Sequence, residues 1–360
     1  LLDKNQEVRI FAKYKEKKES YEKGLKKLPI KMIRCWSNEE SISLKKLFKE
    51  LLKFQPNIIH VQDIFRREEG LRTIQKLFPG KVIMTFHSVN APKATFHKVK
   101  KISDKEFIKR TKKSINHIII HNSPSKKALI KDSKIRKEKI SIIDHGTLPC
   151  KKISKKKARK KIEFPRGAVL ILTYGFFNPK KGAKKIIEIM PDLLKKIPNL
   201  YYLHIGRKRL FGKDSYLKTF QEIENTIKTS KLKKRVNLIW KYLSEKTVGI
   251  YLRAADLIIL FYHEEYPLLH PSGIAHQVIS SGRPVIATDI TTFSEIPKET
   301  MYRIPYSQEG LKKAIIKILN NKRLQKKLIE NALLYSRASS WENTAKRHLN
   351  VYKKVAEFPK

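Results

Sequence analysis

The sequence is poor in cysteine and in acidic residues, and it has no long apolar run. Cys35 and Cys150 are the only cysteines in 360 residues. A disulfide framework is therefore not expected, and we expect the protein to work in a reducing compartment. No apolar stretch approaches the roughly 18 residues of a membrane-spanning helix, which predicts a chain without one. The chain starts at Leu1 with neither an initiator methionine nor the apolar core of a signal peptide, so we interpret it as a fragment.

Basic residues greatly outnumber acidic ones. The sequence has 80 Lys and Arg against 33 Asp and Glu, a formal net charge of +47, which attracts nucleotides, nucleic acids and anionic lipid surfaces alike. The excess is spread along the chain, which favours a compositional bias toward lysine over a dedicated binding arm. The one dense block, residues 151–161, contains no aromatic residue, which argues against a platform for stacking bases.

Apolar segments of strand type alternate with segments of helical period along the whole chain. Strands are expected at 8–12, 30–33, 57–61, 81–86, 117–120, 140–143, 169–174, 200–205, 236–239, 257–261, 284–288 and 301–304. Helices are expected at 38–54, 66–78, 104–113, 123–131, 154–161, 183–196, 215–228, 244–253, from 272, and at 308–319, 322–336 and 341–354. Such alternation predicts parallel sheets covered on both faces. The turn at 144–149 interrupts it, so we expect two sheets in tandem with a ligand cleft between them.

The segment from Ser272 to Asp289 is the clearest candidate site. Ser272 is a good N-cap, Ile274 and Val278 share a helical face, and Gly282 ends the helix before a buried strand. The free N–H groups at the start of that helix favour an anion, most often phosphate. Alternatively, this is one of the many capped helices that bind nothing.

A second candidate lies between the strand at 169–174 and the next helix. Gly175 lets the backbone turn at the carboxyl end of the strand, where ligands bind in α/β sheets. Lys181 follows at the N-terminus of the next helix and could bind a diphosphate that also contacts Ser272 and Gly273. In so basic a chain, an ordinary surface lysine is the alternative.

Taken together, short blocks of the sequence resemble the family 4 (group 1) glycosyltransferases of GT-B fold, in the same order and at similar spacing. The resemblance covers about residues 58–352 and is strongest in the second half. The blocks are Ile58-Ile59-His60-Val61, Val82–His87, Asp144-His145-Gly146, Gly175 with Lys181-Gly182, Leu203–Gly206, Tyr242–Glu245, Ala254–Leu257, Ser272-Gly273, Gly282–Asp289, Ser294-Glu295 and Ser340–Glu342.

The resemblance implies an α/β protein of GT-B fold, with two Rossmann-like, doubly wound parallel-sheet domains facing across a cleft. It implies an acceptor-side domain at 1–147, a nucleotide-sugar domain at 148–340 and a helix at 341–360 that crosses back to the first domain. The activity implied is transfer of a sugar from a nucleotide diphosphate donor, UDP- or GDP-linked, with retention and with no metal or other cofactor. The acceptor would be a glycan or a lipid-linked glycan.

The same resemblance assigns roles to residues. It makes His87 the active-site imidazole, and Lys181, Ser272, Gly273 and Gly175 the binding site for the donor diphosphate. The ribose and nucleotide contacts would come from Gln277, Gly206 and Arg207, and Glu264, Glu265 and His270 would lie near the donor sugar.

The sequence departs from the family in three places. The usual pair of glutamates corresponds to Leu269 and Gln277, and the usual arginine after Gly175 is Phe176. Gln277 can still bond a ribose, and members with a Ser-Gly pair before the helix commonly lack the glutamates, so we place the chain in that subgroup. The resemblance also leads us to expect that the first strand and its Gly-rich loop are missing, because Glu7–Ala12 resembles the strand that follows them.

Three functions therefore stay open. The first is an active transferase in the cytoplasm, whose basic surface would allow contact with anionic lipid at the inner membrane face. The second is a non-catalytic relative that binds nucleotides or glycans, which the departures favour. The third is a nucleic-acid-binding protein, which only the charge favours, since no recognition motif accompanies it and no specific nucleic acid is expected.

Overall fold

The computed structural model describes residues 7–13, 30–36, 44–62, 68–78, 80–87, 89, 104–148, 153–207, 213–263 and 271–357. The chain forms two compact units. Unit 1 comprises residues 1–144 and 342–360, and unit 2 comprises residues 145–341.

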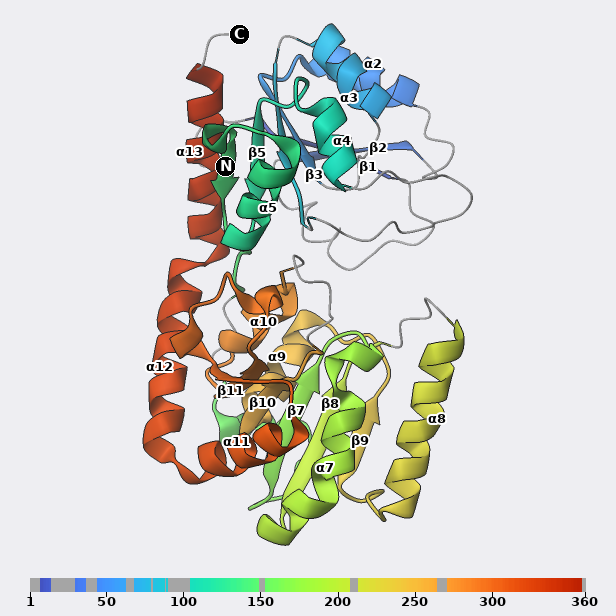
Figure 1. Ribbon diagram of the computed structural model, residues 1–360, viewed down its shortest axis with the longest axis vertical. Coiled ribbons are helices and arrows are strands. Elements are labelled where there is room, and N and C mark those ends of the chain that lie inside the picture. The colour runs from blue at the N-terminus through green and yellow to red at the C-terminus, as the bar shows by residue number, and fades with distance from the viewer. Residues whose placement is uncertain are drawn as a thin grey trace. The chain divides into compact units, whose positions relative to one another are not determined.

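Unit 2 contains a six-stranded parallel sheet (Figure 1). Its strands follow the order β12-β11-β10-β7-β8-β9, so the chain builds outward from β7 in one direction and then from β10 in the other. A gap between neighbouring loops opens at such a reversal, at the carboxyl ends of the two central strands. The strands are β7 (Val169–Tyr174), β8 (Leu200–Ile205), β9 (Val236–Ile239), β10 (Leu257–Leu260), β11 (Val285–Thr288) and β12 (Tyr302–Ile304).

Both faces of this sheet are buried. Successive side chains of a strand point to opposite faces, and helices cover each face. Ile171 and Ile259 belong to one apolar cluster, whereas their neighbours Leu172 and Leu260 belong to the other. The first cluster includes side chains of α7 (Ala183–Lys196), α8 (Lys213–Thr229) and α11 (Gln308–Asn320). The second includes side chains of α6 (Lys155–Lys161), α9 (Glu245–Ala254), α10 (Gly273–Ile279) and α12 (Lys322–Ala338).

Unit 1 contains a four-stranded parallel sheet and a two-stranded one. The larger has the order β3 (Ile58–Gln62), β4 (Lys81–Thr85), β5 (His117–Ile120), β6 (Ile140–Ile142), and the smaller pairs β1 (Arg9–Lys13) with β2 (Lys31–Trp36). Helix α13 (Trp341–Glu357) packs Val351 and Val355 against the larger sheet at Ile83, Ile119 and Ile143. The remaining helices are α2 (Leu44–Phe54), α3 (Glu68–Leu77), α4 (Asp104–Thr111) and α5 (Ser123–Ser133).

The expected alternation of strands and helices is confirmed. The strands expected at 117–120, 169–174, 200–205 and 236–239 have the bounds of β5, β7, β8 and β9, and the helix expected at 183–196 has those of α7. The other elements in the described ranges differ by a few residues at their ends, and the start of the helix expected at 38–54 lies outside the described residues. Within the part of the chain that the structure describes, no helix has the length and apolar character needed to cross a bilayer.

Part of the basic block at 151–161 pairs with one carboxylate. Asp256 precedes β10 and forms ion pairs with Lys155 and Arg159 of α6. Its Oδ2 also accepts a hydrogen bond of 2.7 Å from the backbone N–H of Leu170 in β7, and Arg159 donates to the carbonyl oxygens of Ala168 and Ala254. The Asp256 side chain is 17% exposed, so these charge-assisted bonds hold α6 on the sheet.

We predict that Asp256→Asn lowers the free energy of unfolding by about 2–3 kcal/mol, because it leaves two cations and a backbone donor around a neutral amide. Urea denaturation of the purified variant measures this. The matched control is Asp289→Asn, which removes an exposed pair with Lys298 and should cost less than about 1 kcal/mol. Equal effects of the two substitutions would contradict the prediction.

Candidate functional site

Three segments of unit 2 meet at the carboxyl end of β7. Gly175 follows β7 with a φ of 125°, a backbone conformation that glycine adopts without strain. A Cβ atom on Gly175 would lie 2.3 Å from Cδ1 of Ile274 in α10 and 3.5 Å from Nζ of Lys181. The turn, the lysine and the first turn of α10 therefore share one small space between β7 and β10, the two central strands.

Lys181 reaches this space from a short 3-10 turn, Pro179–Lys181. The side chain of Asn178 caps the turn by accepting from the backbone N–H of Lys180, and Gly182 ends it and begins α7. Nζ of Lys181 lies 5.1 Å from the centre of the Tyr262 ring, just after β10. The ammonium group is thus held at the carboxyl edge of the sheet, where it creates positive potential.

The N-terminus of α10 is open on its outer side. Ser272 caps the helix, because its side chain accepts from the backbone N–H of Ala275 at 3.4 Å. Among the residues that the structure describes, none would lie within 4 Å of a Cβ atom on Gly273, so these residues leave the backbone there accessible to another molecule. Gln277, half-buried, lies one turn further along the same helix.

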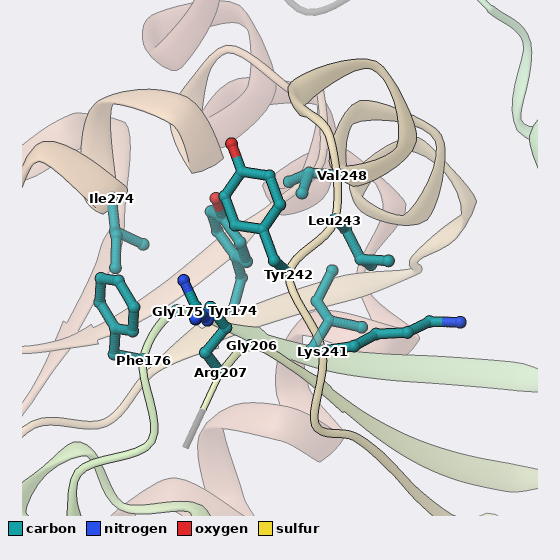
Figure 2. A pocket seen from close by; sticks show the side chains of 11 residues that line it. Tyr174, Gly175, Phe176, Gly206, Arg207, Lys241, Tyr242, Leu243, Val248 and Ile274 are labelled. Carbon is teal, nitrogen blue, oxygen red and sulfur yellow. The ribbon is translucent and has the colours of Figure 1, made fainter. Parts of the chain in front are cut away.

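A pocket adjoins these segments at the ends of β7, β8 and β9 (Figure 2). Its volume, about 120 Å³, is below the roughly 300–1,000 Å³ of sites that enclose whole ligands, so it has room for a single ring-sized group. A Cβ atom on Gly206 would lie 1.8 Å from the carbonyl oxygen of Gly175, which keeps two of the lining loops in contact. The lining residues are Tyr174, Gly175, Phe176, Ile205, Gly206, Arg207, Lys241, Tyr242, Leu243, Val248 and Ile274.

The structure thus brings together most of the candidate residues in unit 2. Lys181, Gly175 and the start of α10 at Ser272 and Gly273 converge, and Gly206 and Arg207 line the neighbouring pocket, where the Arg207 guanidinium lies 6.0 Å from the centre of the Tyr242 ring. The three residues expected near the donor sugar, Glu264, Glu265 and His270, lie outside the described residues.

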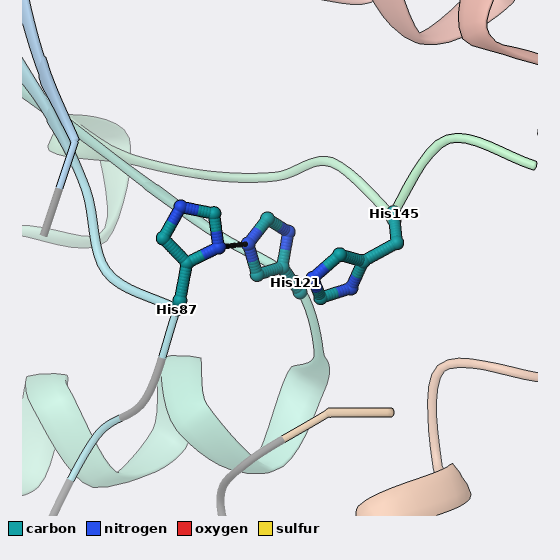
Figure 3. Close-up of side chains that lie close together, drawn as sticks. All are labelled: His87, His121 and His145. Atoms are coloured by element: carbon teal, nitrogen blue, oxygen red, sulfur yellow. Dashed lines mark hydrogen bonds between the residues drawn. The ribbon is translucent and has the colours of Figure 1, made fainter. Parts of the chain in front are cut away.

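In unit 1, His87 forms a pair with a histidine that the sequence did not single out. His87 follows β4 and His121 follows β5, and the two strands are parallel neighbours. The His87 Nδ1 and His121 Nε2 atoms are 3.0 Å apart (Figure 3), and His121 Nδ1 lies 2.8 Å from the carbonyl oxygen of Ile143. That carbonyl can only accept, so His121 carries its proton on Nδ1 and accepts at Nε2 from the N–H of His87.

The position of His121 in the sequence contained a usable signal. Both histidines come directly after buried strands, and the carboxyl ends of neighbouring parallel strands meet at one edge of a sheet. Finding the pair required knowing that β4 and β5 are adjacent.

A family model described as "Glycosyl transferases group 1" matches residues 154–334. The chain belongs to this family. A curated relative is an uncharacterized glycosyltransferase of Methanocaldococcus jannaschii, 25% identical over 189 residues. That match spans 52% of this chain and 48% of the relative.

Solved structures of other proteins resemble this fold over nearly the whole chain. A glycosyltransferase of Rickettsia africae ESF-5 has a TM-score of 0.75 at 20% identity, with 98% of this chain and 91% of that chain covered. The Anabaena protein HepE, in complex with UDP and glucose, has a TM-score of 0.71 at 12% identity, covering 98% of this chain and 100% of that chain. At these identities the similarity shows the fold, which is GT-B with two Rossmann-like domains, as the sequence predicted.

A buried histidine beneath the site makes unit 2 sensitive to acid. His204 in β8 is 4% exposed, and Thr173 Oγ1 lies 2.8 Å from its Nδ1. Burial, with a smaller contribution from the positive charge of Lys181, lowers the pKa of His204 to about 3. An unfolded chain binds a proton at this ring near pH 6.5, so stability is complete above that pH and falls as the pH drops toward 3.

We predict that His204→Gln makes the free energy of unfolding less dependent on pH. Between pH 7 and pH 5 the wild-type protein should lose about 2 kcal/mol more than the variant, since one proton is taken up on unfolding. Denaturant titrations at both pH values measure the difference, and NMR titration of the His204 ring is an independent check. Parallel pH dependence of the two proteins, or a ring that titrates near pH 6, would refute the prediction.

Proposed function

We propose that this chain transfers a sugar from a UDP- or GDP-linked donor to a glycan or lipid-linked acceptor. The observation that carries the proposal is the convergence of Lys181, Gly175 and the open start of α10 at the carboxyl ends of the two central strands of unit 2. In α/β sheets this is where nucleotides bind. Support also comes from HepE, a GT-B protein whose solved structures contain UDP, or UDP-glucose.

The chemistry requires stabilisation of the leaving diphosphate. Negative charge grows on the bridging oxygen as the bond to the sugar breaks, and fixed positive groups at that point lower the barrier. In our proposal Lys181 and the backbone N–H groups at Ser272 and Gly273 supply that charge, and Gly175 leaves room for the diphosphate. The reaction then needs no metal ion at the diphosphate, and we propose that it proceeds with retention.

The nucleoside would occupy the adjoining pocket. One ring would lie beside the loop that contains Gly206 and Arg207, with Tyr242, 61% exposed, next to it. Gln277 on α10 can bond the ribose hydroxyls through its amide. The segment with Glu264, Glu265 and His270 follows β10 in sequence, and we propose that it contributes to donor-sugar binding.

For unit 1 we propose that His87 acts on the substrate and that His121 positions it. Because His121 accepts the Nδ1–H of His87, the His87 ring is held in one orientation. Nε2 lies 3.0 Å from the side-chain oxygen of Gln62, which can only accept, so His87 in this geometry donates at both nitrogens. In our proposal a substrate oxygen replaces Gln62 as the acceptor of the Nε2 proton.

The acceptor and location are also proposals. We propose a cytoplasmic protein whose basic surface binds the anionic face of a membrane, where lipid-linked acceptors are found. Equal recovery on neutral and anionic vesicles at physiological salt would contradict this part.

A second candidate function is that of a non-catalytic relative that binds nucleotides. It is favoured by Leu269 and Phe176, which stand where the resemblance leads us to expect a carboxylate and an arginine. Phe176 is 50% exposed and lines the pocket, so this position supplies contact area instead of charge. Turnover of any sugar nucleotide would exclude this candidate.

The donor site can be tested by calorimetric titration with UDP, GDP and ADP at physiological salt. We expect saturable binding of one nucleotide, and Lys181→Ala should weaken it at least about tenfold, because a charge-assisted bond to phosphate contributes about 1.5–3 kcal/mol. Lys180→Ala is the matched control, since Lys180 belongs to the same turn and is exposed. If no nucleotide binds, the donor proposal fails; if Lys181→Ala binds like the wild type, the assigned lysine is wrong.

The positioning role of His121 has its own test, in steady-state kinetics with the donor identified above. His121→Phe removes the acceptor of the His87 N–H and should lower kcat about 100-fold, with little change in the KM for the donor. His121→Gln, whose side-chain oxygen can accept that bond, should retain more activity. His117→Gln is the control, because His117 is buried in the same strand region and bonds Ser141 instead. A change confined to stability would leave His121 with a structural role only.

A further inference from the structure

Three side chains of unit 2 that the proposed reaction does not use meet in its interior. His145 comes from the turn at the start of the unit, His276 from α10, and Glu295 from the segment after the 3-10 turn Thr291–Phe293. One nitrogen of each histidine and one oxygen of the carboxylate all lie within 4.8 Å of one another. The side chains of His276 and Glu295 are 1% and 0% exposed, and that of His145 is 19% exposed.

A chain of hydroxyl groups fixes which nitrogen of His276 carries a proton. Ser339 Oγ donates to the carbonyl oxygen of Tyr335 at 2.9 Å, so it accepts from Thr147 Oγ1 at 2.7 Å. Thr147, having used its only proton, accepts from His276 Nδ1 at 3.1 Å. The proton of a neutral His276 ring is therefore on Nδ1, and the lone pair of Nε2 faces the carboxylate.

The contact between His276 and Glu295 is close but is not a hydrogen bond. Nε2 and Oε1 are 3.0 Å apart, yet each is a buried atom without a hydrogen-bond partner among the described residues. A protonated Nε2 would direct its N–H at the oxygen. With the His276 proton on Nδ1, two buried lone pairs lie 3.0 Å apart, which is costly unless a cation lies between them or Nε2 takes up a second proton.

The three side chains are close enough together to share one metal ion. Zinc binds histidine nitrogen and carboxylate oxygen at about 2.0–2.2 Å, which places neighbouring ligand atoms about 3.3 Å apart. The Nε2 atom of His276 lies 3.0 Å from Oε1 of Glu295, and the Nδ1 atom of His145 is within hydrogen-bond distance, 3.3 Å, of the other oxygen, Oε2. Each nitrogen thus faces its own oxygen of one carboxylate, and a metal ion would take the place of the proton in the His145 contact. Two imidazoles with one carboxylate favour zinc over magnesium or calcium, which prefer oxygen ligands.

We propose that His145 Nδ1, His276 Nε2 and Glu295 bind a zinc ion, with the fourth position open to water on the exposed side of His145. The chain from Nδ1 of His276 through Thr147 and Ser339 is the outer hydrogen bonding that orients a metal-binding histidine. The ion has a structural role. It joins the turn at His145 to α10, the helix that begins at Ser272 and Gly273, and it does not contact the substrate.

The test uses the full chain without a histidine tag, treated with EDTA and then returned to buffer with and without zinc. We expect one zinc per chain by elemental analysis and a melting temperature several degrees higher with zinc than with EDTA. Cobalt in place of zinc should give the intense visible absorption of a tetrahedral site. Competition with a chromophoric chelator measures the affinity.

Two variants, one at a zinc ligand and one at the hydrogen-bond partner of another ligand, distinguish an effect on metal binding from an effect on folding. His145→Ala changes the most exposed of the three ligands and should weaken zinc affinity more than about 100-fold. Thr147→Val removes only the outer partner of His276 and should weaken it about 10–100-fold. His204→Gln, at a buried histidine elsewhere in the unit, is the control and should retain wild-type affinity.

A wild-type chain that retains no zinc, shows the same melting temperature in zinc and in EDTA, and has a doubly protonated His276 ring by NMR would overturn the proposal. The cluster would then be an imidazolium–carboxylate pair.

Discussion

The candidate site in unit 2 depends on close contact between backbone segments at the carboxyl ends of the central strands. The Gly206 loop touches the carbonyl of Gly175, and the Gly175 turn touches Ile274 at the start of α10. A side chain at either glycine would push these segments apart. Because the loops touch, Lys181 and the open N-terminus of α10 are presented to the same space, and the ring-sized pocket forms beside them. The strand order determines where in the sheet the site lies, and the absence of side chains on Gly175 and Gly206 allows the loops to touch.

Much of the fold was predictable because parallel strands buried on both faces appear as continuous apolar runs. Residues 169–174 and 200–205 are such runs, and they became β7 and β8 without change. Helix ends were less predictable, since they depend on caps and tertiary contacts. Helix α12 continues to Ala338, two residues past its expected end, and α13 continues to Glu357. The residues just past the expected ends, Arg337-Ala338 and Val355–Glu357, fit a helix as well as those before them, so the pattern does not mark where the helix stops.

For the candidate site, the residues that belong to linear motifs were predictable. Lys181, Ser272 and Gly273 stand at positions where helix chemistry and strand ends alone suggest an anion. The side-chain pairs were not predictable, because they join residues distant in sequence. His121 meets His87 only once β4 and β5 pair, and Glu295 meets His145 and His276 only once three segments have folded together. Family resemblance marked Glu295 as a motif residue but did not indicate what it contacts.

Because carboxylates are scarce in this chain, each buried one has to pair with several positive or donor groups. Asp256 serves two cations and a backbone N–H, and Glu295 serves two imidazoles, whereas the acidic residues of the exposed helices make interchangeable surface pairs such as Lys346 with Glu342. Mutational drift toward lysine can therefore proceed over the outer faces of the helices without altering the architecture. It must stop at these two positions, so they should be the slowest-changing acids in a lineage whose surface has become so basic.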